Sequence, residues 1–185
     1  CHRFITALVN GTTVNIPCFA PSREAAELEG SKVFAKDFMK KHKIPTANHS
    51  SFDNLKDASA YVRDVFTDHD HRVVIKADGL AAGKGVVLPE TLEQALEELR
   101  GIIDDGKFCT AGSSVVIEEY MEGDEVSILT FSDGKTFFSL PAGQDHKRIF
   151  EDNKGPNTGG MGVYSPVPFV TPEMSKEIDE TIVKP

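Results

Sequence analysis

The spacing of hydrophobic positions predicts four helices along the chain. Two early segments carry apolar residues three and four positions apart, which places these residues on one face of a helix. A third segment has the clearest apolar stripe and begins with a Thr-x-x-Gln capping box. A Thr-Pro pair, with the threonine as N-cap, marks the start of the last helix. The predicted helices cover residues 22–39, 55–66 and 92–103, and the last one begins after Thr171.

Short runs of β-branched residues between these helices predict strands. The first two runs flank a glycine-rich segment, so the pattern there is strand, loop, strand. The last two runs flank Asp133-Gly134, a pair that is typical of a β-hairpin turn. The predicted strands cover residues 73–77, 86–88, 115–117, 126–131 and 136–140.

Residues 141–168 show hardly any periodicity and are rich in Gly, Pro, Asn and charged side chains. This composition predicts an irregular loop that is too long to be a simple connection in a compact domain. Long ordered loops of this kind usually carry function. We therefore expect part of a binding or catalytic site in this segment.

Composition excludes two broad classes of function. The chain has 185 residues and a formal net charge of −9, and no apolar run approaches the 18 or so residues that a membrane span needs. The acidic balance also argues against nucleic-acid binding through phosphate contacts, which requires excess Lys and Arg. Cys1, Cys18 and Cys109 are too few and too widely spaced for a disulfide framework, so we expect a cytoplasmic protein.

The glycine-rich segment 79–85 has the character of a nucleotide-covering loop. It lacks the Walker A spacing and leads into a strand rather than a helix, as glycine loops that fold over a nucleotide do. Lys76, at the end of the preceding strand, is placed to reach phosphate oxygens. An ordinary hairpin with a solvated lysine is the alternative, and spacing alone leaves both open.

Acidic residues follow the strand at 115–117 and suggest contacts to a nucleoside. Glu118-Glu119-Tyr120 ends this strand, where its backbone could pair with an adenine edge and a carboxylate could accept from ribose hydroxyls. Glu125, which opens the next strand, has two interpretations, a ribose acceptor or a turn acid. A polar strand end without function is the commoner alternative for the first group.

The densest group of candidate residues lies in the long loop. Lys147 and Arg148 supply the local positive charge that an acidic protein needs to bind an anion. Four glycines within residues 155–162 let the backbone approach a ligand and offer amide donors for phosphate or carboxylate groups. A flexible solvated loop is the alternative, but Met161 and the lack of linker residues weigh against it.

Four motifs together give the chain a recognisable resemblance. VVIKADGLAAGKGVV, VVIEEYMEGDEVS, QDHKR and GPNTGGMGVYSPVP resemble, in this order, glycinamide ribonucleotide synthetase, or phosphoribosylamine-glycine ligase, of the ATP-grasp superfamily. The match runs from about Pro17 to Pro185. It implies an α+β chain with a partial ATP-grasp fold. In this scheme residues 1–50 are a loosely matching segment and linker helix, 51–120 the small lobe with the glycine-rich lid, and 121–185 the first part of the larger lobe.

The resemblance implies an ATP-dependent carboxylate-amine ligase of de novo purine biosynthesis. Such an enzyme joins glycine to 5-phosphoribosylamine through glycyl phosphate and releases ADP and phosphate, with Mg²⁺ or Mn²⁺ as cofactor. Its partners are therefore small molecules, with no nucleic acid and no membrane, and the parent protein is expected to be fused in some organisms to other purine-synthesis domains. Two alternatives remain, another ATP-grasp carboxylate-amine ligase and a nucleotide-binding module without turnover.

Individual residues acquire roles only through this resemblance. The implied catalytic residues are Asp145, Lys147 and Arg148. The implied ATP-binding residues are Lys36, Lys76, Gly83, Lys84, Gly85, Glu118, Glu119, Tyr120 and Glu125, and the implied substrate-binding residues are Asn157, Thr158, Gly159, Gly160, Met161 and Gly162.

The chain departs from the family pattern at both ends. The family's N-terminal domain has no counterpart here, and the family's metal ligands lie on a strand beyond the position of Pro185, so no metal ligand is assigned. A first residue of Cys1 and an uncapped helix at Pro185 lead us to expect a piece of a longer protein. We expect the 185 residues alone not to catalyse ligation.

Overall fold

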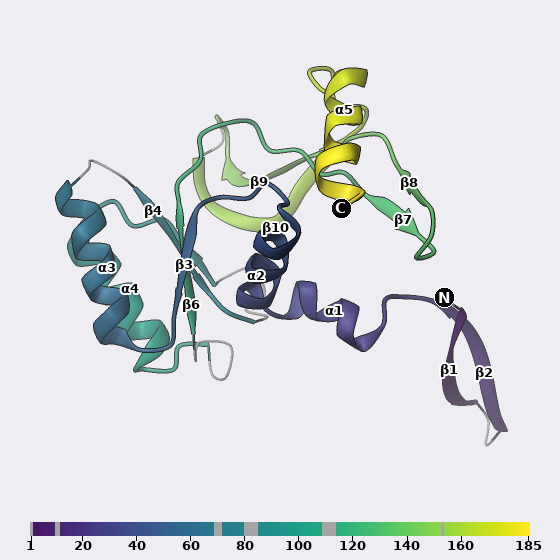
Figure 1. The fold of residues 1–185 in the computed structure, drawn as a ribbon, viewed down its shortest axis with the longest axis horizontal. Coiled ribbons are helices and arrows are strands. Elements are labelled where there is room, and N and C mark those ends of the chain that lie inside the picture. The colour runs from purple at the N-terminus through teal and green to yellow at the C-terminus, as the bar shows by residue number, and fades with distance from the viewer. Residues whose placement is uncertain (1, 10–11, 69–71, 80–84, 109–113, 153) are drawn as a thin grey trace.

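The main sheet of the protein has four antiparallel strands in the order β3-β6-β4-β5 (Figure 1). The computed structural model describes residues 2–9, 12–68, 72–79, 85–108, 114–152 and 154–185. The three predicted strands of this sheet are confirmed to within two residues, and β3 was not predicted. The bounds are His49–Phe52 for β3, Val73–Ala77 for β4, Val86–Val87 for β5 and Val115–Glu119 for β6.

The two faces of this sheet have different coverings. Along β4, Val73, Ile75 and Ala77 are buried, and the residues between them lie on the opposite face. Helices α3 (Leu55–Asp68) and α4 (Leu92–Ile103) lie side by side and cover the face of Ile75 (Figure 1). The core between them contains Ala58, Val62, Val73, Ile75, Ala77, Ala95, Leu99, Ile102, Val115 and Ile117.

Both helices of this layer confirm the sequence pattern. Helix α4 has the predicted bounds, and its apolar stripe places Ala95, Leu99 and Ile102 in the core. The Thr91 hydroxyl accepts a hydrogen bond from the Gln94 amide at 3.3 Å. The Gln94 side chain, however, accepts from the amide of Glu90 rather than from that of Thr91, so half of the capping box forms as predicted.

The predicted helix over 22–39 is in fact two helices, α1 (Arg23–Gly30) and α2 (Lys32–His42). Ser31 has an extended backbone between them and accepts a hydrogen bond from the amide of Phe34, so it is the N-cap of α2. Its hydroxyl also donates to the carboxylate of Asp78, 47 residues away in the chain. The prediction of one helix was wrong because this contact comes from tertiary structure.

Asp78 directly follows β4 and holds the start of α2 against it. Its Oδ1 accepts from the amide of Val33 at 3.1 Å and from the hydroxyl of Ser31 at 3.1 Å. Burial alone would raise the pKa of Asp78. These hydrogen bonds, together with backbone donors at Gly79 and Lys32, outweigh burial and lower the pKa below its ordinary value.

Two short hairpins flank this part of the chain. The hairpin predicted around Asp133-Gly134 is confirmed, but its strands β7 (Thr130–Ser132) and β8 (Phe137–Ser139) are shorter than predicted. The Asp133 carboxylate accepts from two amides in the turn, those of Lys135 and Thr136. The first hairpin, β1 (His2–Val9) with β2 (Thr12–Phe19), was not predicted.

The segment predicted as an irregular loop forms an antiparallel pair of strands. Strand β9 covers Gln144–Phe150 and strand β10 covers Lys154–Tyr164. The pairing shifts register twice, between Lys154 and Asn157 and between Asn157 and Gly162. These shifts explain the missing periodicity, because unmatched residues in β10 interrupt the alternation of its side chains.

The last helix begins as predicted, with Thr171 as N-cap and Pro172 in its first turn. Its bounds are Pro172–Ile178 for α5, followed by a π-helical turn η2 over Asp179–Val183. The hydroxyl of Ser139 on β8 donates to the Asp179 carboxylate at 2.6 Å, which fixes this end of the chain to the hairpin. Among the described residues no helix is long and apolar enough to cross a membrane.

The role of Asp78 in joining β4 to α2 can be tested through its dependence on pH. Asp78→Ala should lower the free energy of unfolding at pH 7 by about 1 kcal/mol, the usual cost of a lost acceptor at a helix N-terminus. Because the folded state lowers this pKa, the contribution is complete above the unfolded-state value of about 3.9 and is lost as pH falls through the folded-state value.

Urea unfolding of the unaltered chain and of Asp78→Ala between pH 7 and pH 3, followed by circular dichroism, measures the difference in their free energies of unfolding. Asp37→Ala, which removes an exposed carboxylate from α2, is the matched control and should have little effect. A difference between Asp78→Ala and the unaltered chain that stays constant down to pH 3 would contradict the assignment.

Candidate functional site

The carboxylate of Glu118 binds two lysine ammonium groups from different elements. Lys76 Nζ lies 2.9 Å from Oε2, and Lys36 Nζ lies 3.3 Å from Oε1. Exposure falls from 28% for the Lys76 side chain to 8% for Lys36 and 7% for Glu118. The three residues form a cluster with one net positive charge, closed on the side of Lys36 and open on the side of Lys76.

The register of the sheet explains why these side chains meet. Lys76 pairs with Val116 across β4 and β6, and Glu118 pairs with Val74. Lys76 and Glu118 are therefore diagonal neighbours on the face opposite to α3 and α4. Helix α2 contacts β6 and brings Lys36, the buried residue of that helix, to the same carboxylate.

Lys36 has a further set of acceptors that sequence reasoning did not identify. Its ammonium donates to Thr46 Oγ1 at 2.7 Å and to the carbonyl of Ala47 at 3.3 Å. Together with the ion pair to Glu118, these two hydrogen bonds hold the ammonium in a buried position. Lys76 donates to Glu118, and its partial exposure leaves room for a ligand beside it.

The base of the glycine-rich segment is fixed next to this cluster. The Lys32 ammonium donates to the carbonyl of Gly79 at 2.8 Å, and the Ala77 amide donates to the carbonyl of Gly85 at 2.8 Å. Gly79 has a φ of 72°, which favours glycine. Gly85 is buried at the far side of the segment. Of the other residues predicted to bind ATP, Gly83 and Lys84 lie outside the described residues.

The next two candidates, Glu119 and Tyr120, contact other parts of the protein. Both oxygens of Glu119 accept from Asn48, one from its amide at 2.8 Å and one from its side chain at 3.0 Å. These hydrogen bonds lower the pKa of Glu119. The guanidinium of Arg72 lies 4.2 Å from the centre of the Tyr120 ring, and Arg72 also pairs with Glu122. These contacts hold the chain where it leaves the sheet.

Glu125 and Lys147 form an ion pair, which joins the segment after the sheet to β9. Sequence reasoning assigned the two residues to different parts of the site. The Glu125 side chain is 61% exposed and that of Lys147 38%, so solvent screens the pair and it contributes little to stability by itself. It brings the predicted ribose acceptor to the strand that carries Asp145 and Arg148.

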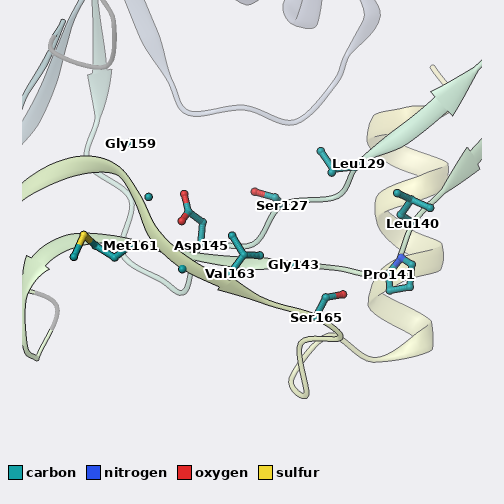
Figure 2. Close-up of a pocket in the computed structure, with 12 residues that line it drawn as sticks. Ser127, Leu129, Leu140, Pro141, Gly143, Asp145, Gly159, Met161, Val163 and Ser165 are labelled. Carbon is teal, nitrogen blue, oxygen red and sulfur yellow. The ribbon is translucent and has the colours of Figure 1, made fainter. Parts of the chain in front are cut away.

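Strands β9 and β10 line a pocket of about 710 Å³ (Figure 2). Asp145 lies in it, and its Oδ1 is buried without a hydrogen-bond partner among the described residues. A buried carboxylate oxygen without a partner is costly, so it marks a place where a donor from a ligand would be favourable. The other lining residues are Ser127, Leu129, Leu140, Pro141, Gly143, Gly159, Gly160, Met161, Gly162, Val163 and Ser165.

Four of the six predicted substrate residues line this pocket, namely Gly159 to Gly162. The hydroxyl of Thr158 accepts from the amide of Gly160 at 3.1 Å, which shapes the turn beside them. Asn157 is exposed and pairs with Arg148 across the two strands. Arg148 itself donates to the carbonyl of Gly155 at 2.6 Å and so stabilises the irregular part of the pairing.

Sequence reasoning missed the residues that support the lysine cluster and the glycine segment. Thr46 and Asn48 belong to a polar stretch with no periodicity, so nothing in the sequence marks them. Asp78 had a signal, since an acid between a buried strand and a glycine is typical of a structured turn. Its partners Ser31 and Ser114 become apparent only in the folded chain.

Comparison with known proteins gives consistent matches over most of the chain. The family model "Phosphoribosylglycinamide synthetase, ATP-grasp (A) domain" matches residues 30–185. A bifunctional purine biosynthetic protein of Schizosaccharomyces pombe is 54% identical over 172 residues, which are 93% of this chain and 21% of that protein. The phosphoribosylamine–glycine ligase of Streptococcus pneumoniae is 48% identical over 170 residues, which are 92% of this chain and 40% of that protein.

A solved structure agrees with these sequences. The crystal structure of a phosphoribosylamine–glycine ligase from Thermotoga maritima matches with a TM-score of 0.79 at 37% identity, over 88% of this chain and 40% of that one. The chain therefore spans less than half the length of each of these relatives.

The glycines of the pocket differ in what they tolerate. Gly160 has a φ of 127°, and an added Cβ would lie 3.0 Å from Asp145 Oδ1. Gly160→Ala should therefore lower the free energy of unfolding by about 1 to 3 kcal/mol, the usual cost of such backbone strain. Gly159→Ala is the matched control, because an added Cβ there meets nothing within 4 Å. Equal midpoints for the two variants in thermal unfolding would contradict this geometry.

Proposed function

The chain belongs to the phosphoribosylglycinamide synthetase ATP-grasp family, and from this premise we propose that the protein ligates glycine to 5-phosphoribosylamine with cleavage of ATP. The carrying observation is the convergence of two lysines from α2 and β4 on the buried carboxylate of Glu118, next to the glycine-rich segment. Paired lysines beside a glycine-rich segment suit a polyphosphate ligand, because they supply fixed positive charge without a side-chain nucleophile.

The chemistry of the reaction matches the residues that are present. A glycine carboxylate is a poor electrophile, so ATP converts it to glycyl phosphate, and the sugar amine then displaces phosphate. Lys76 would contact the phosphate oxygens, and Lys36 would add its positive charge from the buried side of the cluster. Lys84, Gly83 and Gly85 would belong to the segment that covers them. Glu119, Tyr120 and Glu125 are proposed to lie at the nucleoside end.

The second half of the proposed site is the pocket of Asp145. Its glycines, Gly159, Gly160 and Gly162, offer an open backbone that can approach a small substrate closely. We propose that glycine and phosphoribosylamine bind here, with Asp145, Lys147 and Arg148 next to the reacting groups and Asn157, Thr158 and Met161 around the substrates. This assignment rests on the pocket, on the buried Asp145 oxygen and on the motifs of the family.

A divalent metal, Mg²⁺ or Mn²⁺, is part of the proposed reaction. The described residues contain no group of three or more His, Cys, Asp or Glu side chains that could hold it, so we assign no step to it. When bound, the metal compensates charge on the transferred phosphate. We further propose a cytoplasmic protein in which residues 51–120 are the nucleotide lobe and 121–185 begin the second lobe, with 1–50 as linking segment.

Fusion to other enzymes is a related proposal. A protein of Schizosaccharomyces pombe that resembles this chain is named as a bifunctional purine biosynthetic protein. Similar ligases from bacteria, of which the chain covers about two fifths, carry the single name phosphoribosylamine–glycine ligase. We propose that this chain works either as part of a bifunctional purine biosynthetic protein or as part of a separate ligase.

The phosphate role of Lys76 predicts a loss of ATP affinity. In the full-length protein Lys76→Ala should raise the dissociation constant of ATP at least tenfold, because a charge-assisted contact of about 1.5 to 3 kcal/mol is removed. Isothermal titration calorimetry measures the constant. Lys41→Ala, which removes an exposed lysine of α2, is the control. An unchanged dissociation constant for Lys76→Ala would leave this residue with only its structural ion pair to Glu118.

The substrate role of the β9–β10 pair predicts a loss of turnover with little loss of ATP affinity. Asn157→Ala and Arg148→Ala should lower kcat/KM for glycine at least tenfold and change the ATP dissociation constant less than twofold. Asn157 gives the cleaner result, because Arg148 also supports the fold through Gly155. Lys154→Ala on the same strand is the exposed control. Normal turnover with weakened ATP binding would contradict the substrate assignment.

A further inference from the structure

The two lysines of the Glu118 cluster are held very differently. The ammonium of Lys36 donates hydrogen bonds to Thr46 and to the carbonyl of Ala47 and forms an ion pair with Glu118. Lys76 contacts the other oxygen of the same carboxylate and is 28% exposed. Glu118 therefore forms ion pairs with one buried lysine and with one partly exposed lysine.

We propose that Glu118 is a positioning residue that aims the ammonium of Lys76 at the phosphates of the nucleotide. This inference rests on the proposed function, and it gives Glu118 a role that differs from contact with adenine or ribose. Lys36 holds the carboxylate in place through an ion pair, and the carboxylate fixes the end of the Lys76 side chain. Glu118 thus acts through Lys76 and touches no ligand in this role.

The geometry indicates that the fold fixes Glu118 and that Glu118 in turn fixes Lys76. The backbone of Glu118 lies in the middle of the sheet, opposite His49 on one side and Val74 on the other. Its side chain is buried, so its position is set by the fold. A long lysine side chain, in contrast, loses rotamer entropy when it is fixed. Glu118 fixes Lys76 before the ligand arrives, which removes this cost from binding.

Charge alone predicts the opposite effect of removing this carboxylate. A negative group near the binding site repels a polyanion, so its removal should tighten ATP binding if electrostatics were the whole of its role. Loss of positioning should weaken ATP binding, because the two ammonium groups then repel each other and Lys76 becomes free to move. The sign of the change therefore separates the two explanations.

The test uses Glu118→Gln in the full-length protein, with ATP and adenosine as probes in parallel titrations. Adenosine carries the base and the ribose without phosphates. We expect the dissociation constant of ATP to rise about tenfold and that of adenosine to change less than twofold. Asp37→Asn, which removes an exposed carboxylate of α2, is the control for a simple change of charge and should not weaken ATP binding.

Other results would overturn the inference. Unchanged or tighter ATP binding in Glu118→Gln would show that the carboxylate does not aim Lys76. Equal weakening for ATP and adenosine would assign Glu118 to the nucleoside or to the fold. If the unaltered protein bound adenosine normally and ATP no better than adenosine, the proposed function itself would fail, and this result is distinct from the other two.

A second variant keeps the inference testable if Glu118→Gln does not fold. Thr46→Val removes one acceptor of Lys36 at an exposed position and leaves every charge in place. If Lys36 holds Glu118, and Glu118 holds Lys76, this variant should raise the ATP dissociation constant two- to threefold and leave adenosine binding unchanged. An unchanged dissociation constant of ATP would overturn the proposal that Lys36 positions Lys76 through Glu118.

Discussion

The carboxylate of Glu118 lies almost fully buried, and a buried charge must be paired with an opposite one or the fold loses several kcal/mol. This requirement connects three elements that are distant in the chain. Strand β6 carries the carboxylate, β4 supplies Lys76 and α2 supplies Lys36. Helix α2 therefore lies over the sheet face opposite to α3 and α4, with Lys36 on the buried side of the carboxylate and Lys76 on its partly exposed side.

The fold was largely predictable where local pattern and tertiary environment agree. Helix α4 has its predicted bounds because one stripe of apolar residues faces one core. The pattern failed at Ser31, where a hydrogen bond to Asp78 divides a continuous helical segment. It also failed at β9 and β10, where register shifts remove the alternation by which a strand is recognised. In both cases the deciding contacts are distant in sequence.

The candidate site was predictable in its residue types but not in its contacts. Lys36, Lys76 and Glu118 were all named as nucleotide residues, yet nothing in their spacing indicates that they share one ion-pair cluster. Antiparallel pairing of β4 with β6 makes Lys76 and Glu118 diagonal neighbours, a relation that depends on register. Likewise, Glu125 and Lys147 were named separately and meet only because β9 runs beside the segment after the sheet.

The two halves of the site meet different chemical demands and are built differently. In the proposed function phosphates need fixed positive charge, and the cluster would provide it with one net positive charge in a protein whose total is −9. Because surface charges are screened within about 10 Å, the local cluster determines the attraction and the acidic remainder of the surface does not. A small substrate needs close approach and a few directed polar groups. In the proposed site, strands β9 and β10 would provide these with the glycines of β10 and with the Asp145 oxygen that has no partner among the described residues.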